Sequence, residues 1–314
     1  MPFDLKITSP TQPGVSDVVG GTITVLDNAD GTWQLTSPDA ITEFRMNTNK
    51  GDITKAEMIT ESLTTLNRAF YQCAKLKTFV ASSGMFSQVT DMLFCFSGCY
   101  KLETVSLFDT SNVSSFSRTW SNCKKLKNIP NFNTSSGTNF YSAWSNCILL
   151  TSFPLLDTSE GTNFKSAWYN CKNLPSFPAL DTSKGTRFYA TWRKCQKLTS
   201  LPLLDTSKGT DFGKCFDSCT SLKCMQRVDT TSATSVAGIF LNTGALCRPN
   251  STEQAQIAQT PGINWVSDRA YGDDCCIAVV SGGSKVGASD VLKCYIGEVE
   301  ISKGILQGVD CLVS

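Results

Sequence analysis

The most constraining feature of the sequence is a cysteine that returns at a fixed interval. After a first gap of 26 residues, five successive gaps are all 24, which gives a cysteine column of Cys73, Cys99, Cys123, Cys147, Cys171, Cys195 and Cys219. An aromatic residue stands three places before each of these cysteines, and in the middle of the column it is tryptophan: Trp120, Trp144, Trp168 and Trp192. Leucine stands three places after each cysteine. Such a register predicts a solenoid, in which each unit buries its apolar residues against its neighbours.

A single unit also predicts its local structure. In the segment GTNFKSAWYNCKNL, Thr162 is a candidate N-cap residue. Phe164, Trp168 and Cys171 follow at the i, i+4 and i+7 spacing that places residues on one face of a helix. The segment 174–177 reads as a short strand, and the Asp-Thr-Ser run then turns the chain back. The expected fold class is therefore an α/β solenoid.

The pattern F-x-x-C-x-x-L-x-x-F/L over about residues 60–247 resembles the leucine-rich repeat superfamily, and most closely its BspA-type repeat. The version W-x-x-C-x-x-L-x-x-F-P-x-L-D-T-S is also similar to repeats in predicted bacteriophage tail and virion proteins. The resemblance implies a leucine-rich-repeat solenoid of 24-residue coils with one short parallel strand and one short helix per coil. The chain departs from the family pattern at Pro130, Pro154, Pro178 and Pro202. Because proline donates no hydrogen bond to a strand ladder, we expect very short strands.

The two ends lack this period. Residues 1–58 are predicted to form a β-rich N-terminal module, with a hairpin in GGTITVLDNADGTWQLTS and a further strand in ITEFRMN. This module is interpreted either as a cap on the solenoid or as a docking module. The solenoid is predicted to span residues 59–247. Residues 248–314 are predicted to form a C-terminal β-rich domain, with a short helix at 250–260 and strands in the segments 275–283, 291–302 and 311–314.

Composition argues against several classes of function. The 314 residues carry a net charge of +1 and no histidine, so no global field points to nucleic acid or to a membrane. No signal peptide, no apolar run long enough for a membrane span and no catalytic motif is visible. We therefore expect a protein that is not an enzyme, has no cofactor, binds no nucleic acid and does not insert into a membrane.

Cysteines and aspartates are the residue types in this sequence that could hold a metal ion. The pairs Cys95/Cys99 and Cys215/Cys219 are far apart and have no histidine to complete a zinc site, so no metal is predicted. Cysteines in the column are expected to be buried thiols, while disulfides among the cysteines outside it are left open. A second repeated position holds aspartate or asparagine: Asp109, Asn133, Asp157, Asp181, Asp205 and Asp229. These residues are expected to close Asx turns, with a calcium site as the alternative.

Lysines gather just after the cysteine column. In a solenoid these positions stack along one edge, and they hold Lys75, Lys77, Lys101, Lys124, Lys125, Lys127, Lys172, Lys197 and Lys223, with Glu103 as the one acid. The candidate ligand-binding residues are Lys101, Lys124, Lys125, Lys127, Lys172 and Lys197. A neighbouring outward row offers hydroxyl and amide groups at Thr78, Thr104, Asn128, Ser152, Ser176 and Ser200. The edge is either a solvated surface or a site for anionic glycans.

The resemblance implies a non-enzymatic bacteriophage virion structural protein, and within that class a tail-fibre or receptor-binding component. Its expected partners are other virion proteins, a host-surface glycan or protein, and further copies of itself in a homo-oligomer. The expected location is the virion, assembled in the host cytoplasm. The alternatives are a capsid decoration protein of the phage head, and a cellular protein-binding leucine-rich-repeat adaptor or adhesin.

Overall fold

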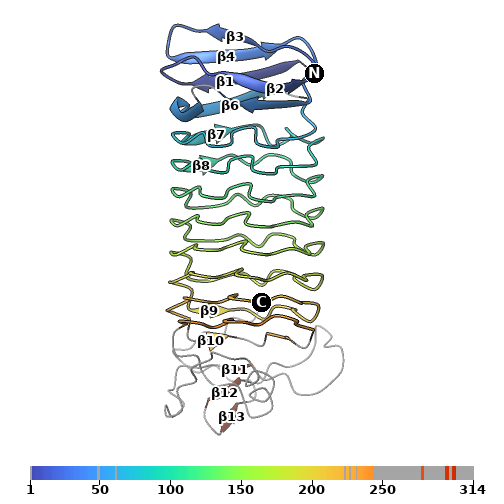
Figure 1. Ribbon diagram of the computed structural model, residues 1–314, viewed down its shortest axis with the longest axis vertical. Helices are drawn as coiled ribbons and strands as arrows, with labels where there is room; N and C mark the ends of the chain where they lie inside the picture. The colour runs from blue at the N-terminus through green and yellow to red at the C-terminus, as the bar shows by residue number, and fades with distance from the viewer. Residues whose placement is uncertain are drawn as a thin grey trace.

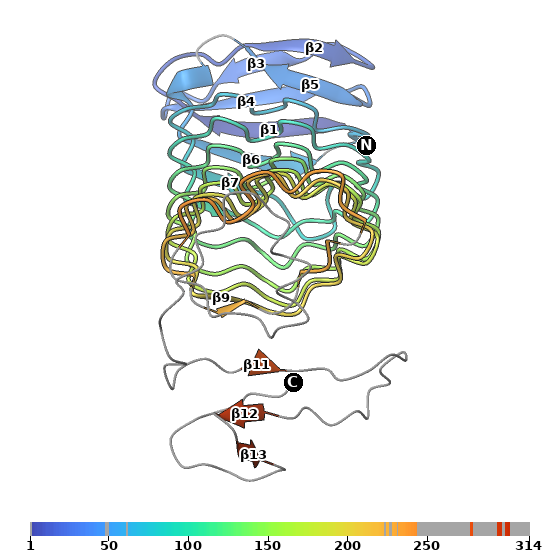
Figure 2. The same cartoon turned by 60° about the horizontal axis from the view of Figure 1, so that its bottom comes forward.

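The computed structural model describes residues 2–47, 50–60, 62–222, 224–225, 228–230 and 232–243, together with three short strands nearer the C-terminus. The coils stack into one elongated solenoid, with the N-terminal strands at one end (Figure 1). Successive coils follow nearly the same outline (Figure 2), so residues one repeat apart lie above one another. The repeat solenoid predicted from the cysteine interval is thus confirmed.

The N-terminal module consists of two small sheets. Strand β1 (Phe3–Thr8) pairs antiparallel with β4 (Thr32–Ser37) and β6 (Lys55–Thr60), and β3 (Thr24–Asp27) pairs with β4. Strand β2 (Val15–Val19) pairs with β5 (Glu43–Met46). The predicted hairpin is present as β3–β4, and the predicted further strand is β5.

The N-terminal module passes its sheet directly into the solenoid. After the 3₁₀ helix η1 (Lys50–Asp52), β6 pairs in parallel with β7 (Thr78–Val80), which pairs in parallel with β8 (Thr104–Val105). The hydrophobic core is continuous across this joint, because the ring of Phe44 lies 5.1 Å from that of Phe3 and 5.7 Å from that of Phe70. The module therefore covers the apolar end of the first coil, as solenoids require.

We call the face of the solenoid that carries β7 and β8 the strand face. Strands are scarce along the rest of it. In the described coils, only β9 (Ser200–Leu201) and β10 (Cys224–Met225) follow β8, and they pair in parallel. On this face the middle coils carry Pro130, Pro154 and Pro178. Neighbouring middle coils are joined by single backbone hydrogen bonds, such as that from the Thr151 N–H to the Lys127 carbonyl at 3.1 Å. The expectation of very short strands is confirmed.

The helix predicted in each coil is wrong for the described residues, which contain no α-helix. Its place is taken by a turn face, which we define as the eight residues before each column cysteine. In the coil of Cys171, the amide of Phe164 donates to a carbonyl of the next coil, that of Arg187, at 2.9 Å. The amides of Ser166, Trp168 and Asn170 do the same. The amides of Ala167 and Tyr169 instead close turns within their own coil, onto the carbonyls of Phe164 at 3.0 Å and of Ser166 at 3.1 Å.

A repeated left-handed backbone explains why the helix does not form. Ser166 and Asn170 have φ angles of 55° and 61°, and the two corresponding positions of the other coils are also at positive φ. A left-handed residue every fourth position cannot continue a right-handed helix, and it turns alternate N–H groups toward the next coil. Isolated parallel bridges, including Asn139 to Asn163 and Asn163 to Arg187, run along this face from Thr65 to Ser235.

Flat stacked side chains fill the interior. Trp168 lies nearly parallel to Trp144 and Trp192, with ring centroids 5.5 and 5.6 Å away. The column cysteines and the leucines that follow them are fully buried in every described coil. The indole N–H groups of four tryptophans are buried without a hydrogen-bond partner in the described part of the chain: Trp120, Trp144, Trp168 and Trp192.

Three short strands are described in the C-terminal segment: β11 (Ile277–Ala278), β12 (Cys294–Ile296) and β13 (Val299–Ile301). They form an antiparallel sheet in the order β11-β12-β13. They fall within two of the segments that were predicted as strands. The predicted helix at 250–260, the predicted strand at 311–314 and the rest of residues 248–314 lie outside the described residues.

Candidate functional site

The lysine edge follows the cysteine column, at the corner where the turn face passes into the strand face. Its described members are all exposed: Lys75, Lys77, Lys101, Lys124, Lys125, Lys127, Lys172 and Lys197. Lys223 lies outside the described residues. In the coil of Cys147, the corner instead holds the uncharged residues Ile148, Leu149 and Thr151. This neutral coil divides the edge into two parts. The first part is Lys75, Lys77, Lys101, Lys124, Lys125 and Lys127, and the second is Lys172 and Lys197.

Most of the lysine edge has no acidic partner. Lys75 pairs with Asp52 at 2.8 Å, and the ammonium of Lys124 lies 4.9 Å from the ring centroid of Tyr100. Within the described residues, no carboxylate forms an ion pair with the six candidate ligand-binding lysines, which are Lys101, Lys124, Lys125, Lys127, Lys172 and Lys197. The edge therefore carries uncompensated positive charge in contact with solvent.

The predicted outward row runs beside this edge. Thr104, Asn128, Ser152, Ser176 and Ser200 are exposed, and Thr78 is partly exposed. Neighbouring members contact one another, since the Ser152 hydroxyl donates to the Asn128 side-chain oxygen at 3.0 Å. The row thus places hydrogen-bonding groups next to the lysines.

The repeated aspartates act as turn residues. Asp157 Oδ1 accepts from the Ser159 N–H at 3.0 Å and from its hydroxyl at 2.7 Å, and these bonds lower the pKa of the Asp157 carboxyl. Asp109, Asn133, Asp181 and Asp205 accept the equivalent backbone bond in their own coils. Across the described residues, no group of three or more cysteine, aspartate or glutamate side chains is arranged to hold a metal ion.

The threonine after each aspartate has a role that the sequence reasoning missed. Thr158 is buried, and its hydroxyl donates to the Asp181 carbonyl of the next coil at 2.6 Å. The same bond recurs for Thr110, Thr134, Thr182 and Thr206. The sequence did contain a sign of this hydrogen bond, because a threonine that recurs at a buried position of every coil needs a hydrogen-bond acceptor there.

The column cysteines are bonded and chemically protected. The Cys171 thiol donates to the Trp144 carbonyl of the preceding coil at 3.3 Å, and Cys99, Cys123, Cys147, Cys195 and Cys219 make the equivalent bond. Burial raises the pKa of Cys171 to about 12 and the pKa of Cys147 well above its usual value. Because the thiolate is the reactive form, these cysteines are poor nucleophiles.

A second charged feature, also missed from the sequence, lies on the turn face. We call it the cation–aromatic row, since cations and aromatic rings alternate over seven successive coils: Arg68, Phe94, Arg118, Tyr141, Lys165, Tyr189 and Lys214. The Arg118 guanidinium lies 5.0 Å from the Phe94 ring centroid and 4.8 Å from that of Tyr141. Arg68 lies 5.3 Å from the Phe94 ring, and Lys165 lies 5.1 Å from the Tyr189 ring.

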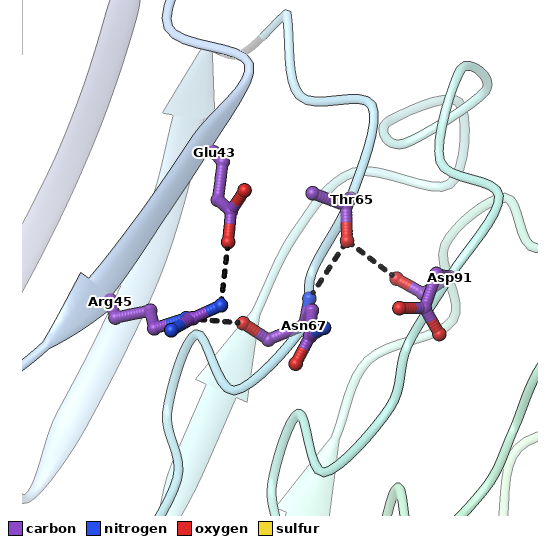
Figure 3. A network of polar contacts seen from close by, with 5 residues as sticks. All are labelled: Glu43, Arg45, Thr65, Asn67 and Asp91. Atoms are coloured by element: carbon purple, nitrogen blue, oxygen red, sulfur yellow. Dashed lines mark hydrogen bonds and ion pairs between the residues drawn. The ribbon is translucent and has the colours of Figure 1, made fainter. Parts of the chain in front are cut away.

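At the N-terminal end, this face is joined to β5 by a polar network (Figure 3). Arg45 donates from Nε to the Asn67 carbonyl at 3.3 Å and pairs with Glu43 at 2.9 Å. Thr65 donates to the carbonyl of Asp91 at 3.3 Å and accepts from the Asn67 N–H at 3.1 Å. The network fixes the first coils of the turn face to the N-terminal module.

Comparison with known proteins gives a family match. A family model described as "Mycoplasma protein of unknown function, DUF285" matches residues 41–153, 64–179 and 151–253. No curated protein matches the chain. None of the helices in the described part of the chain has the length and apolar character to span a membrane.

Two solved structures of repeat proteins resemble the fold. A leucine-rich repeat protein of T. pallidum is 16% identical with a TM-score of 0.40, and the likeness covers 78% of this chain and 96% of that one. A leucine-rich repeat protein of Bacteroides ovatus is also 16% identical with a TM-score of 0.23, over 72% of this chain and 92% of that one.

Proposed function

The chain belongs to the family described as "Mycoplasma protein of unknown function, DUF285", and we propose that its solenoid is a rigid, non-enzymatic surface for binding an extended anionic ligand. The observation that carries the proposal is the lysine edge. Its six candidate lysines are exposed and lack carboxylate partners among the described residues. A surface of stacked like charges attracts polyanions through many weak contacts.

The interior supports a scaffold rather than a catalyst. The repeated cysteine, threonine and aspartate groups are each engaged in a bond that holds one coil to the next or closes a turn. The residues left for function are therefore the exposed ones on the outside of the coils. We therefore propose a binding role in which the lysine edge supplies charge and the outward hydroxyl row supplies hydrogen bonds to an anionic glycan.

The biological setting stays a prediction from the sequence. None of the relatives named above is a bacteriophage protein, so the tail-fibre or capsid role rests on the resemblance of the repeats alone. A surface adhesin or adaptor would use the same lysine edge. Mass spectrometry of purified virions and of membrane fractions from the source cells would distinguish these settings.

The binding proposal predicts a salt-sensitive interaction with an anionic glycan. We expect the protein to bind heparin beads but not neutral dextran beads, and to lose binding as salt shortens the screening length below about 8 Å. Lys124→Glu with Lys125→Glu should weaken heparin binding by on the order of tenfold, since each exposed charge contributes up to about 1 kcal/mol.

The matched control is Lys184→Glu with Lys208→Glu, which makes the same change in net charge at the opposite corner of the coil. Lys184 and Lys208 are exposed, and the surface ion pair of Lys184 with Glu160 contributes at most about 1 kcal/mol, so neither double variant is expected to unfold the solenoid. Equal losses in the two variants would mean that net charge alone controls binding. Unchanged heparin binding in the Lys124/Lys125 variant would contradict the proposal and mean that the lysine edge is only a solvated surface.

A further inference from the structure

The cation–aromatic row is a regular, preorganised and positively charged surface. Counted over the turn face of the seven described coils, there are seven cations (Arg68, Arg118, Lys165, Arg187, Arg193, Lys194, Lys214) and three acids (Asp91, Asp211, Asp217), a net charge of +4. Asp217 is already paired with Arg193 at 2.7 Å. The complementary ligand for this face is therefore an anion.

The side chains of the row are held in place before any ligand binds. Arg118 lies between two rings, and its Nη2 donates to the Tyr141 hydroxyl at 2.9 Å. A guanidinium has five N–H donors, and the described side-chain contacts of Arg118 use one of them. An ordered arginine with free donors loses little side-chain entropy when it binds an anionic group.

The spacing of the cations points to a ligand with its own regular repeat. Arg68, Arg118, Lys165 and Lys214 occupy every second coil, with an aromatic ring in each coil between them. Adjacent coils are separated by about the 4.8 Å of neighbouring strands, so the cations recur about every 10 Å along a line of roughly 30 Å. The stacked rings of Phe116 and Phe140, 5.5 Å apart at their centroids, agree with this rise.

A single-stranded nucleic acid fits the row poorly. It places a charge on every residue, and its bases need free ring faces on which to stack. Here both faces of Phe94 are covered, because Arg68 and Arg118 lie at 5.3 and 5.0 Å from its centroid. At Phe94, therefore, the edge of the ring rather than a free face is left for a ligand.

We propose that the cation–aromatic row binds an extended acidic polysaccharide in which charged and neutral sugars alternate. The polymer lies along the solenoid axis, with each carboxylate against a cation of every second coil and each neutral sugar against the edge of the intervening ring. A disaccharide of an extended β-linked chain covers a distance comparable to two coils. The site is separate from the lysine edge, and it extends the proposed function from general attraction of polyanions to selection by charge spacing.

The test uses hyaluronan oligosaccharides, whose carboxylates fall on alternate sugars. The comparison probes are oligogalacturonate with a charge on every sugar, an oligo-dT strand, and neutral dextran. With the full chain, we expect hyaluronan to bind more tightly than each comparison probe by tenfold or more. Its affinity should rise with length until the oligosaccharide spans the four cations. No hyaluronan binding, or equal binding of oligogalacturonate or oligo-dT, would overturn the proposal.

Variants locate the site. Arg118→Gln with Lys165→Gln should lower hyaluronan affinity at least tenfold, while Arg118→Lys with Lys165→Arg, which keeps both charges, should retain most of it. Lys124→Gln with Lys125→Gln on the lysine edge should leave hyaluronan binding within twofold while it weakens heparin binding. Circular dichroism melting of each variant checks that the solenoid is folded. Hyaluronan binding that follows the lysine edge instead of the row would refute this inference and leave the proposed function standing.

Discussion

Replacement of Trp168 tests the stacked core most directly. Its side chain is fully buried, and its ring lies between Trp144 at 5.5 Å and Trp192 at 5.6 Å. The rings of Phe153 and Phe177 contact it edge-on at 5.3 and 4.6 Å. Trp168→Ala removes these contacts, together with the stacked contact to Phe164 at 6.1 Å, and leaves a cavity that rigid neighbouring coils cannot fill, so we expect a loss of about 3–5 kcal/mol in the free energy of unfolding.

Trp168→Phe separates the value of the ring from that of the indole N–H. The N–H is buried without a partner among the described residues, which is itself unfavourable, and phenylalanine removes it. The equivalent position already holds Phe70, Phe96 and Phe216 in other coils. We therefore expect Trp168→Phe to cost less than about 1.5 kcal/mol, as conservative core replacements do.

Urea unfolding followed by far-ultraviolet circular dichroism would measure both variants. For a chain of this size, the alanine variant should also lower the melting temperature by roughly 6–20 °C. The reasoning fails if Trp168→Ala unfolds like the wild type, because the side chain would then not be packed in the core. It also fails if Trp168→Phe costs as much as Trp168→Ala, because the aromatic stack would then contribute nothing.

Two further predictions concern the interior. Because burial raises the pKa of Cys171 to about 12, above the usual thiol value of about 9, the folded state holds this proton when the unfolded state has lost it. Stability should therefore fall as pH rises from about 9 toward 12, and iodoacetamide should label Cys171 only after unfolding; rapid labelling of the native protein at pH 8 would contradict its burial. Gly161→Ala should cost about 1–3 kcal/mol, since a Cβ there would overlap the Phe164 ring and lie 2.9 Å from the Thr158 carbonyl oxygen. Gly84→Ala, where a Cβ would meet nothing within 4 Å, is the matched control for urea unfolding.

The interior was predictable because burial depends on residue type at a fixed position. Phe164, Trp168, Cys171 and Leu174 all point into the core, as their recurrence indicated. Their spacing did not determine the backbone, since two successive four-residue turns present the same positions as two turns of a helix. A signal for the turns was present at Asn122, Asn146, Asn170 and Gly98, because asparagine and glycine are the residues that most readily adopt positive φ.

The surface was only partly predictable, for a different reason. The lysine edge was visible because lysines recur near one landmark, the cysteine. The cation–aromatic row shifts between two positions of the coil, so that Tyr141 follows Arg118 by 23 residues and Lys214 follows Tyr189 by 25. When the coils are aligned at the repeat length, these contacting residues fall at different positions of the coil. The row therefore becomes apparent only from the contacts between the side chains in the structure.

The near-identity of the middle coils has a consequence for folding. Coils centred on Cys123, Cys147, Cys171 and Cys195 offer one another almost the same stack of tryptophan, cysteine and leucine. A chain that paired one of these coils with the next coil but one would lose little interior contact and would have to eject a complete coil as a loop. The pairing of β6 with β7 and the hydrogen bond of Arg45 to Asn67 mark the N-terminal end, and the described middle coils do not repeat them. We expect folding that starts at this end to pair each coil with its correct neighbour. Folding that starts in the middle is expected to produce some solenoids that lack one coil.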